Sequence, residues 1–308
     1  MSYDPRELTI ISKVFKDLPR QQISRKDWKN EGFWHHFYWF FEKIITGIDK
    51  YFEVEEIQYV APIQTKHIPE NNTGRITHYK ASSKKAVILL PPRGIGYDFS
   101  QTLACYLAAR DISAYHMELP LRGTRLPPTK NKSICDVDLN LDILETIFDQ
   151  TVSEIGGLLN IVEEERVGIF GVSLGGIYSS IAYGLDDRLT SGCLALTGGN
   201  IRDLIFNSKD RLALAIREYV EREQPEESEI KRVLDHVEPC NFTNPDKADK
   251  LLMLTAKSDR HVPPQYGESL LEAWGSPKIV ELKGGHGSVI FQAPSILKKV
   301  YQHFEKTL

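Results

Sequence analysis

From residue 84 to the end of the chain, short continuous apolar runs alternate with longer stretches in which apolar positions recur with a helical period. A continuous run is typical of a strand buried on both faces, and a helical stripe is typical of a helix that covers such strands. The pattern predicts strands at 86–90, 113–119, 166–171, 190–197, 251–256 and 278–282, with helices at about 99–110, 137–160, 265–274 and 294–306. Repeated strand–helix units imply a mostly parallel central sheet flanked by helices, with the functional site at the carboxyl ends of the strands.

Residues 200–248 interrupt this alternation. They contain charged helical stretches at 211–222 and 226–236 and no strand signal. A purely helical segment between two strands of a sheet domain is typical of an insertion, so we predict a helical cap here.

The region before residue 84 has a different pattern. Two extended segments, at 54–63 and 75–80, are separated by a turn-rich stretch, as in a hairpin. We therefore divide the chain into an N-terminal helical extension over residues 1–52 and a main domain over residues 53–308.

The N-terminal extension carries an unusual aromatic run. Seven of the nine residues at 33–41 are aromatic, within a predicted helix at about 27–48. So much aromatic surface is costly to leave in water, and on a helix it cannot all face one way. We expect one face to pack on the core, and the rest to meet the cap above the site, a second subunit of a homodimer, or a membrane surface as a peripheral contact.

Composition narrows the classes of function. The chain has 308 residues, 41% hydrophobic and 26% charged, with a formal net charge of −4, so nucleic acid is not an expected partner. The four cysteines have no metal-binding spacing, and the start of the chain has no signal-peptide pattern. No apolar stretch is long enough for a transmembrane span, and we expect a cytoplasmic protein.

One turn between a predicted strand and a helix of small residues carries candidate chemistry. It reads Gly171-Val-Ser173-Leu-Gly175, the Gly-x-Ser-x-Gly spacing of a nucleophile elbow. The sharp turn projects the Ser173 hydroxyl from the sheet, and the two glycines let strand and helix approach closely. The backbone N–H of Leu174, at the start of the helix, is then available to stabilise an oxyanion.

The motif alone is weak, because chance supplies about 0.1 matches in a chain of this composition. Its context resembles the α/β-hydrolase superfamily, and more specifically its single-domain esterase and dienelactone-hydrolase-like branch. Four features carry the resemblance in chain order: the loop Pro91–Gly96 after a buried strand, Ser173, Asp259 after a later strand, and His286 in a glycine loop. The resemblance covers about residues 54–308 and implies an α/β-hydrolase fold.

The resemblance implies a catalytic triad. Ser173 is the expected nucleophile, His286 the base that activates it, and Asp259 the acid that orients the imidazole. Asp203, shortly after the preceding strand, is the alternative acid. His261 is close to Asp259 in sequence, but we expect its side chain to point elsewhere.

The loop after the strand 86–90 is expected to supply the second oxyanion donor. Its two prolines have no N–H group, so the donor is expected to be the backbone N–H of Arg93 or, less favourably, that of Gly94. The same two residues are the expected substrate contacts. The Arg93 guanidinium either contacts an anionic part of the substrate or forms a structural ion pair. Arg122 and Arg125 are expected in a solvated loop.

Together these features predict a serine hydrolase that cleaves a carboxylic ester, or a related acyl compound, through an acyl-enzyme. No motif for a nucleotide cofactor or a metal ion is found, so no cofactor and no metal ligands are predicted. Thioesterase, peptidase and acyltransferase activities share the same machinery and stay open. A non-catalytic small-molecule receptor or interaction protein of the same fold is the alternative from another class.

Overall fold

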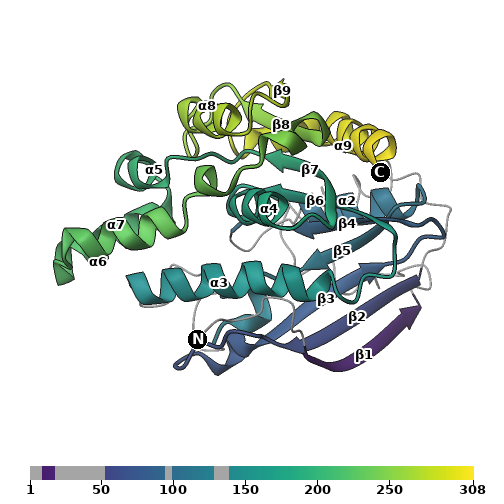
Figure 1. The fold of residues 1–308 in the computed structure, drawn as a ribbon, viewed down its shortest axis with the longest axis horizontal. Helices are drawn as coiled ribbons and strands as arrows, with labels where there is room; N and C mark the ends of the chain where they lie inside the picture. The colour runs from purple at the N-terminus through teal and green to yellow at the C-terminus, as the bar shows by residue number, and fades with distance from the viewer. Residues whose placement is uncertain (1–8, 18–52, 94–98, 128–138) are drawn as a thin grey trace, which may run out of the picture.

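A single sheet of nine strands runs through the part of the chain that is described here (Figure 1). The structure is a computed structural model, and it describes residues 9–17, 53–93, 99–127 and 139–308. The strand order across the sheet is β1-β2-β3-β5-β4-β6-β7-β8-β9. The strands are β1 (Thr9–Asp17), β2 (Glu53–Val60), β3 (Thr73–Tyr79), β4 (Lys85–Leu90), β5 (Ser113–Met117), β6 (Arg166–Val172), β7 (Leu189–Ala195), β8 (Leu251–Ala256) and β9 (Lys278–Leu282).

The sheet has an antiparallel edge and a parallel body. Strands β1, β2, β3 and β5 pair antiparallel, and the pairs from β5 through β4, β6, β7 and β8 to β9 are parallel. Parallel strands need crossover connections, which the helices supply. The helices are α2 (Phe99–Ala108), α3 (Leu141–Leu158), α4 (Leu174–Leu185), α5 (Ile201–Asn207), α6 (Arg211–Glu223), α7 (Glu227–His236), α8 (Pro264–Ala273) and α9 (Ala293–Thr307). Short 3-10 turns are η2 (Pro69–Asn72), η3 (Gly123–Arg125), η5 (Pro239–Phe242), η6 (Pro245–Lys250) and η7 (Ser288–Gln292).

Both faces of the parallel body are covered by helices. In β4, Ile88 and Leu90 belong to the core beneath α3 and α4, which lie on the near side in Figure 1. Val87 and Leu89 belong to the core shared with α2 and α9. Side chains of a strand alternate between the two faces, so a strand covered on both sides is continuously apolar. This is why the apolar runs predicted these strands well.

The predicted element order is confirmed by the structure. Strands β8 and β9 have the predicted bounds, and β4 begins one residue earlier than predicted. Helix α3 is shorter than expected and begins after Asn140, whose side chain accepts a hydrogen bond from the Ile143 N–H at 2.8 Å. Such an N-cap satisfies one of the donors that the first turn leaves free.

Strand β1 was not predicted. It pairs antiparallel with β2, from Thr9 opposite Val60 to Asp17 opposite Glu53, and so adds a strand at the edge of the sheet. Part of the N-terminal extension is therefore a strand. The helix predicted at 27–48 and its aromatic run lie outside the described residues.

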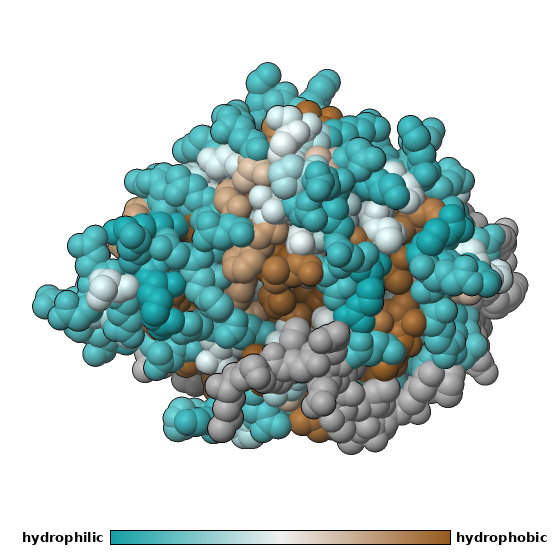
Figure 2. Space-filling model, in the orientation of Figure 1, coloured by the Kyte–Doolittle hydropathy of each residue, from teal (hydrophilic) through white to brown (hydrophobic). Residues whose placement is uncertain are grey.

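The segment 200–248 is helical, as its pattern indicates. It contains α5, α6 and α7, followed by η5 and most of η6. Figure 1 shows α5, α6 and α7 projecting to one side of the sheet. Figure 2, in the same orientation, shows apolar residues gathered in a hollow near the centre of the view, with hydrophilic residues to its left and right. None of the helices in the described ranges combines the length and apolar character of a membrane span.

A buried ion pair lies beneath the antiparallel edge, and it corrects one expectation. Arg125 was expected in a solvated loop, but its side chain is 0% exposed and its guanidinium lies 2.7 Å from the Glu154 carboxylate. It also donates to the backbone oxygens of Asn71 and Glu118, and Tyr59 donates to Glu154 at 2.7 Å. A buried guanidinium is tolerated only where such partners replace water. Here they tie α3 and η3 to the edge strands.

Candidate active site

Ser173 occupies a strained turn between β6 and α4. Its backbone has φ 53° and ψ −117°, in a region that L-residues rarely adopt, which costs about 1–3 kcal/mol. A Cβ on Gly171 would lie 2.2 Å from the Gly175 oxygen, and one on Gly175 would lie 2.4 Å from the Pro91 oxygen. Only glycine therefore fits at these two positions. The Ser173 N–H donates to the Ala195 oxygen at 2.8 Å, which fixes the turn against β7.

Leu174 begins helix α4 directly after the serine. The first N–H groups of an α-helix have no acceptor within the helix, and the helix dipole makes this end electropositive. Leu174 lines the same pocket as Ser173. Its N–H is thus suited to stabilise negative charge that develops next to the serine.

Asp259 and His286 form a second polar unit, on the loops that follow β8 and β9. His286 Nδ1 donates to Asp259 Oδ2 at 2.7 Å. The Asp259 side chain is only 2% exposed, and its other oxygen accepts from the N–H groups of His261 and Val262 at 2.8 and 3.0 Å. A Cβ on Gly285 would lie 2.7 Å from the Ser258 oxygen, so glycine permits the close approach of the two loops.

The Asp259 contact sets the tautomer of His286. A carboxylate only accepts hydrogen bonds, so Nδ1 carries a proton and Nε2 of the neutral ring is left as an acceptor. This is the tautomer that a base needs to take a proton from a hydroxyl. Within the described ranges, the Ser173 hydroxyl and His286 form no hydrogen bond. Such contacts are often loose in unliganded sites and tighten with substrate.

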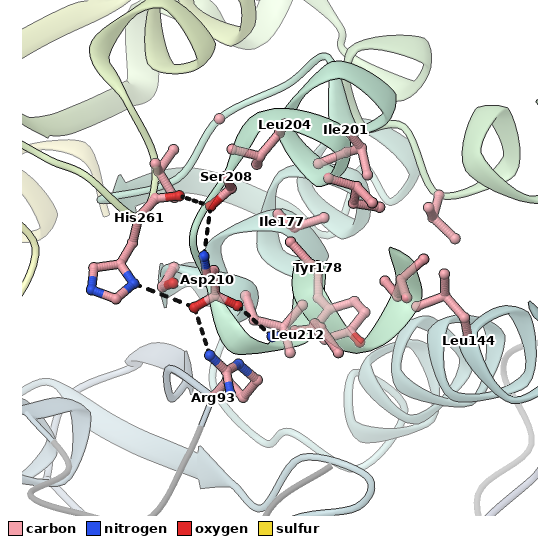
Figure 3. A pocket seen from close by; sticks show the side chains of 18 of the residues that line it. Arg93, Leu144, Ile177, Tyr178, Ile201, Leu204, Ser208, Asp210, Leu212 and His261 are labelled. Atoms are coloured by element: carbon pink, nitrogen blue, oxygen red, sulfur yellow. Dashed lines mark hydrogen bonds and ion pairs between the residues drawn. The ribbon is translucent and has the colours of Figure 1, made fainter. Parts of the chain in front are cut away.

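A pocket of about 110 Å³ opens at Ser173 (Figure 3). Helices α3 and α4 and the predicted cap supply its apolar walls, among them Leu144, Ile177, Leu204 and Ile216. Figure 3 shows Arg93, Ser208, Asp210 and His261 grouped at one end of the pocket, with Leu144 at the opposite end. The pocket can therefore hold an apolar group in its interior with a polar group at its mouth.

The polar end of the pocket is a cluster of three side chains. Arg93, after β4, lies 2.6 Å from Asp210 Oδ2, and His261 Nδ1 lies 3.4 Å from the same oxygen. The rings of His261 and His286 have centroids 5.1 Å apart. Burial raises the pKa of Asp210, but the charge of Arg93 and the Leu212 N–H outweigh that effect and hold the pKa below its ordinary value. Asp210 is therefore ionised at neutral pH.

The cap is also anchored to the loop that carries Asp259. Ser208 donates to the His261 backbone oxygen at 3.0 Å and accepts from the Asp210 N–H at 3.0 Å. Asp203 accepts from the Tyr266 hydroxyl at 2.6 Å. Asp203 thus holds α5 against α8, whereas Asp259 is the carboxylate that contacts His286.

Sequence reasoning found some of these residues and missed others. It paired Asp259 with His286 and left Arg93 with two interpretations, of which the structure shows the ion pair. Gly94 lies outside the described residues. The sequence analysis did not anticipate that the His261 ring would lie beside the His286 ring, or that Asp210 would contact Arg93. Asp210 has a sequence signal as a helix N-cap, but nothing local indicates a partner 117 residues away.

Comparison with known proteins identifies the fold. No family model matches the chain, and no curated protein matches it. Among solved structures, an acetyl xylan esterase from Paenibacillus sp. R4 is similar at 15% identity and a TM-score of 0.61, over 94% of this chain and 100% of that one. A cold-adapted esterase from an Arctic intertidal metagenomic library is similar at 17% identity and a TM-score of 0.52, over 81% and 94%.

The acylaminoacyl peptidase of Pyrococcus horikoshii is similar at 15% identity and a TM-score of 0.61, over 87% of this chain and 43% of that one. This chain thus spans less than half the length of that peptidase. At such low identities the likeness concerns the fold. The chain has the α/β-hydrolase fold, as the sequence resemblance implied. Among the described residues, no group of His, Cys, Asp and Glu side chains is arranged to hold a metal ion.

Proposed function

We propose that this protein is a serine hydrolase that cleaves a carboxylic ester, or a related acyl compound, through an acyl-enzyme on Ser173. The observation that carries the proposal is the 2.7 Å contact between His286 Nδ1 and the buried Asp259. This contact orients His286 as a base. His286 and Asp259 lie on the loops that follow the neighbouring strands β8 and β9. In the same sheet, the turn between β6 and α4 holds Ser173 in a strained conformation. The apolar pocket that opens at Ser173 gives an acyl group a place to bind.

In the proposed first step, His286 Nε2 takes the proton of the Ser173 hydroxyl as its oxygen attacks the carbonyl carbon. The resulting oxyanion accepts hydrogen bonds from the N–H groups of Leu174 and Arg93. His286 then gives the proton to the leaving oxygen as its bond to carbon breaks. Water enters, loses a proton to His286 and attacks the acyl-enzyme, and the collapse of that intermediate returns the proton to Ser173.

Hydrolysis of a carboxylic ester is the first choice within this class. Thioesters, activated amides and transfer to another acceptor use the same steps, and the leaving group and acceptor alone distinguish them. The receptor alternative needs no catalytic base. The Asp259–His286 pair, the shape of the elbow and the available Leu174 N–H all favour catalysis.

A fluorophosphonate probe tests the proposal. It reacts with an activated serine, so the wild-type protein should be labelled on Ser173 and Ser173→Ala should not be labelled. Nitrophenyl esters of increasing chain length then measure turnover. A folded wild-type protein that is neither labelled nor active on any ester would favour the receptor alternative.

A further inference from the structure

The pocket has two chemically different parts. Beyond Ser173 its interior is apolar, with Leu144 of α3, Ile177 of α4, and Leu204 and Ile216 of the cap. Burial of apolar surface is favourable by about 25 cal/mol per Å², so the binding of an apolar group in this interior lowers the free energy of the complex. A charged group that enters loses its hydration and meets no charged partner among these walls.

Among the described residues that line the pocket, the charges at the mouth balance one another. The ionisable side chains that line the pocket and are charged near neutral pH are Arg93 and Asp210, with His261 beside them. Arg93 and Asp210 contact each other at 2.6 Å, with side chains 19% and 24% exposed. Asp210 is held in place independently, because its other oxygen caps α6 through the Leu212 N–H at 2.8 Å.

This arrangement works against an anionic substrate. A carboxylate that ends the acyl group loses its hydration if it lies in the apolar interior. If the chain folds back to the mouth, the carboxylate meets the Asp210 charge and has to compete with it for the Arg93 guanidinium. At a few ångströms, like charges in a partly desolvated site repel strongly. An uncharged acyl group leaves the ion pair undisturbed.

We propose that Asp210 is a specificity-determining residue: by engaging Arg93 it makes the pocket select uncharged apolar acyl groups and reject acyl groups that end in a carboxylate. The inference deepens the proposed function and rests on it for the assignment of the pocket to the acyl group. It also assigns Arg93 a role in shaping selectivity, through its pairing with Asp210.

The test compares two esters of equal chain length, 4-nitrophenyl hexanoate and 4-nitrophenyl hydrogen adipate. The wild-type protein should favour the hexanoate in kcat/KM. Asp210→Asn keeps the shape and the N-cap hydrogen bond but removes the charge. It should shift the ratio of the two kcat/KM values toward the adipate ester by about tenfold or more. Adding Arg93→Gln to Asp210→Asn should abolish that shift.

Glu227→Gln is the matched control. It makes the same chemical change in the cap, at an ion pair with Arg202 of 2.9 Å in which the Glu227 side chain is 83% exposed. The ratio should stay at its wild-type value in this variant. A wild-type protein that hydrolyses both esters equally would overturn the proposal, and so would an unchanged ratio in folded Asp210→Asn.

A second arm tests the interior of the pocket. Ala213 lines it and is buried, whereas the next residue of α6, Leu214, is 40% exposed. Ala213→Leu should lower kcat/KM for an octanoate ester relative to an acetate ester by about tenfold, since added methylenes displace bound chain. Ile216→Ala should shift the preference toward longer chains, and Leu214→Met should change neither. Thermal melts establish that each variant is folded. If neither Ala213→Leu nor Ile216→Ala changed the chain-length preference, the assignment of this pocket to the acyl group would be contradicted.

A binding measurement separates failure of this inference from failure of the proposed function. Calorimetry on Ser173→Ala with hexanamide and with adipamate requires no turnover. Tighter binding of hexanamide, reversed by Asp210→Asn, supports charge selection even if no ester is cleaved. Equal binding, in a protein that fluorophosphonate labels on Ser173, overturns the selectivity and leaves the hydrolase proposal standing.

Discussion

Two arginine–carboxylate pairs mark two regions of the molecule with different demands. At the antiparallel edge, Arg125 and Glu154 are both 0% exposed, and backbone oxygens accept from the remaining donors of the guanidinium. At the mouth of the pocket, Arg93 and Asp210 remain partly exposed and share their surroundings with His261. The contact distances, 2.7 and 2.6 Å, are nearly the same.

The difference lies in what surrounds each pair. A fully buried and fully hydrogen-bonded pair fixes one arrangement of the chain, because removing either partner leaves an uncompensated charge. A partly exposed pair can exchange partners with water or a ligand at modest cost. Ser173, with its strained backbone, belongs to the second region, and backbone strain of this kind is typical of functional sites. The antiparallel edge thus supports the fold, and the carboxyl ends of the parallel strands are free for function.

The largest effect that would separate the two regions is expected at Ser173. Ser173→Ala should lower ester turnover by about 10⁶-fold, because the members of a triad act as one unit. Its melting temperature should stay close to the wild-type value, since only a hydroxyl is removed. Steady-state kinetics and calorimetry measure the two quantities. Near-normal turnover by the folded variant would end the assignment of Ser173 as nucleophile.

The next effect concerns the carboxylate beside His286. Asp259→Asn should lower kcat/KM by about 10⁴-fold, because an amide favours the wrong tautomer of the imidazole. Asp203→Asn is the control, since an amide oxygen can still accept from the Tyr266 hydroxyl, and it should cost far less. If the two variants exchanged their effects, the acid would be Asp203.

The antiparallel edge should respond in stability and leave the chemical step unaffected. Arg125→Met leaves the buried Glu154 carboxylate without its charged partner and should lower the free energy of unfolding by about 3–5 kcal/mol. Arg232→Met removes an exposed partner of Glu145 and should cost far less, because water screens an exposed pair. Denaturant titration measures both. Equal costs would contradict the distinction between a buried and an exposed pair. Loss of kcat in Arg125→Met, at a temperature where the variant is folded, would contradict the expectation that the antiparallel edge leaves the chemical step unaffected.

The smallest effect is a pH dependence of stability at another buried polar group of the scaffold. His303 of α9 contacts the Gly192 oxygen at 2.9 Å, and burial lowers its pKa from 6.5 to about 4. The unfolded chain therefore binds a proton between pH 6.5 and 4 that the folded protein does not. Burial of neutral His303 therefore leaves the free energy of unfolding undiminished above pH 6.5. That free energy falls by about 3 kcal/mol in all as pH drops toward 4.

His303→Gln should flatten the stability profile in this window, because glutamine can donate to the Gly192 oxygen but does not titrate. Denaturant midpoints measured from pH 4 to pH 7 test the expectation. A variant with the wild-type slope would assign the pH dependence to other groups.

The amino-acid sequence by itself determined the strands of the parallel body, the elbow, and the loops that carry Asp259 and His286. These features are local: a strand buried on both faces must be apolar throughout, and the close approach at Gly171 and Gly175 admits no side chain. The catalytic roles of Ser173, Asp259 and His286 stay predictions until they are measured.

Only the tertiary structure decided which polar residues meet. Arg93 contacts a carboxylate 117 residues away, and Arg125, whose neighbours in sequence suggest a solvated loop, is buried against a residue of α3. Strand β1 is likewise recognised through its pairing with β2. The physical reason is common to all three. The environment of a charged side chain or of an edge strand is set by segments distant in sequence, so no local pattern of apolar and polar positions records it.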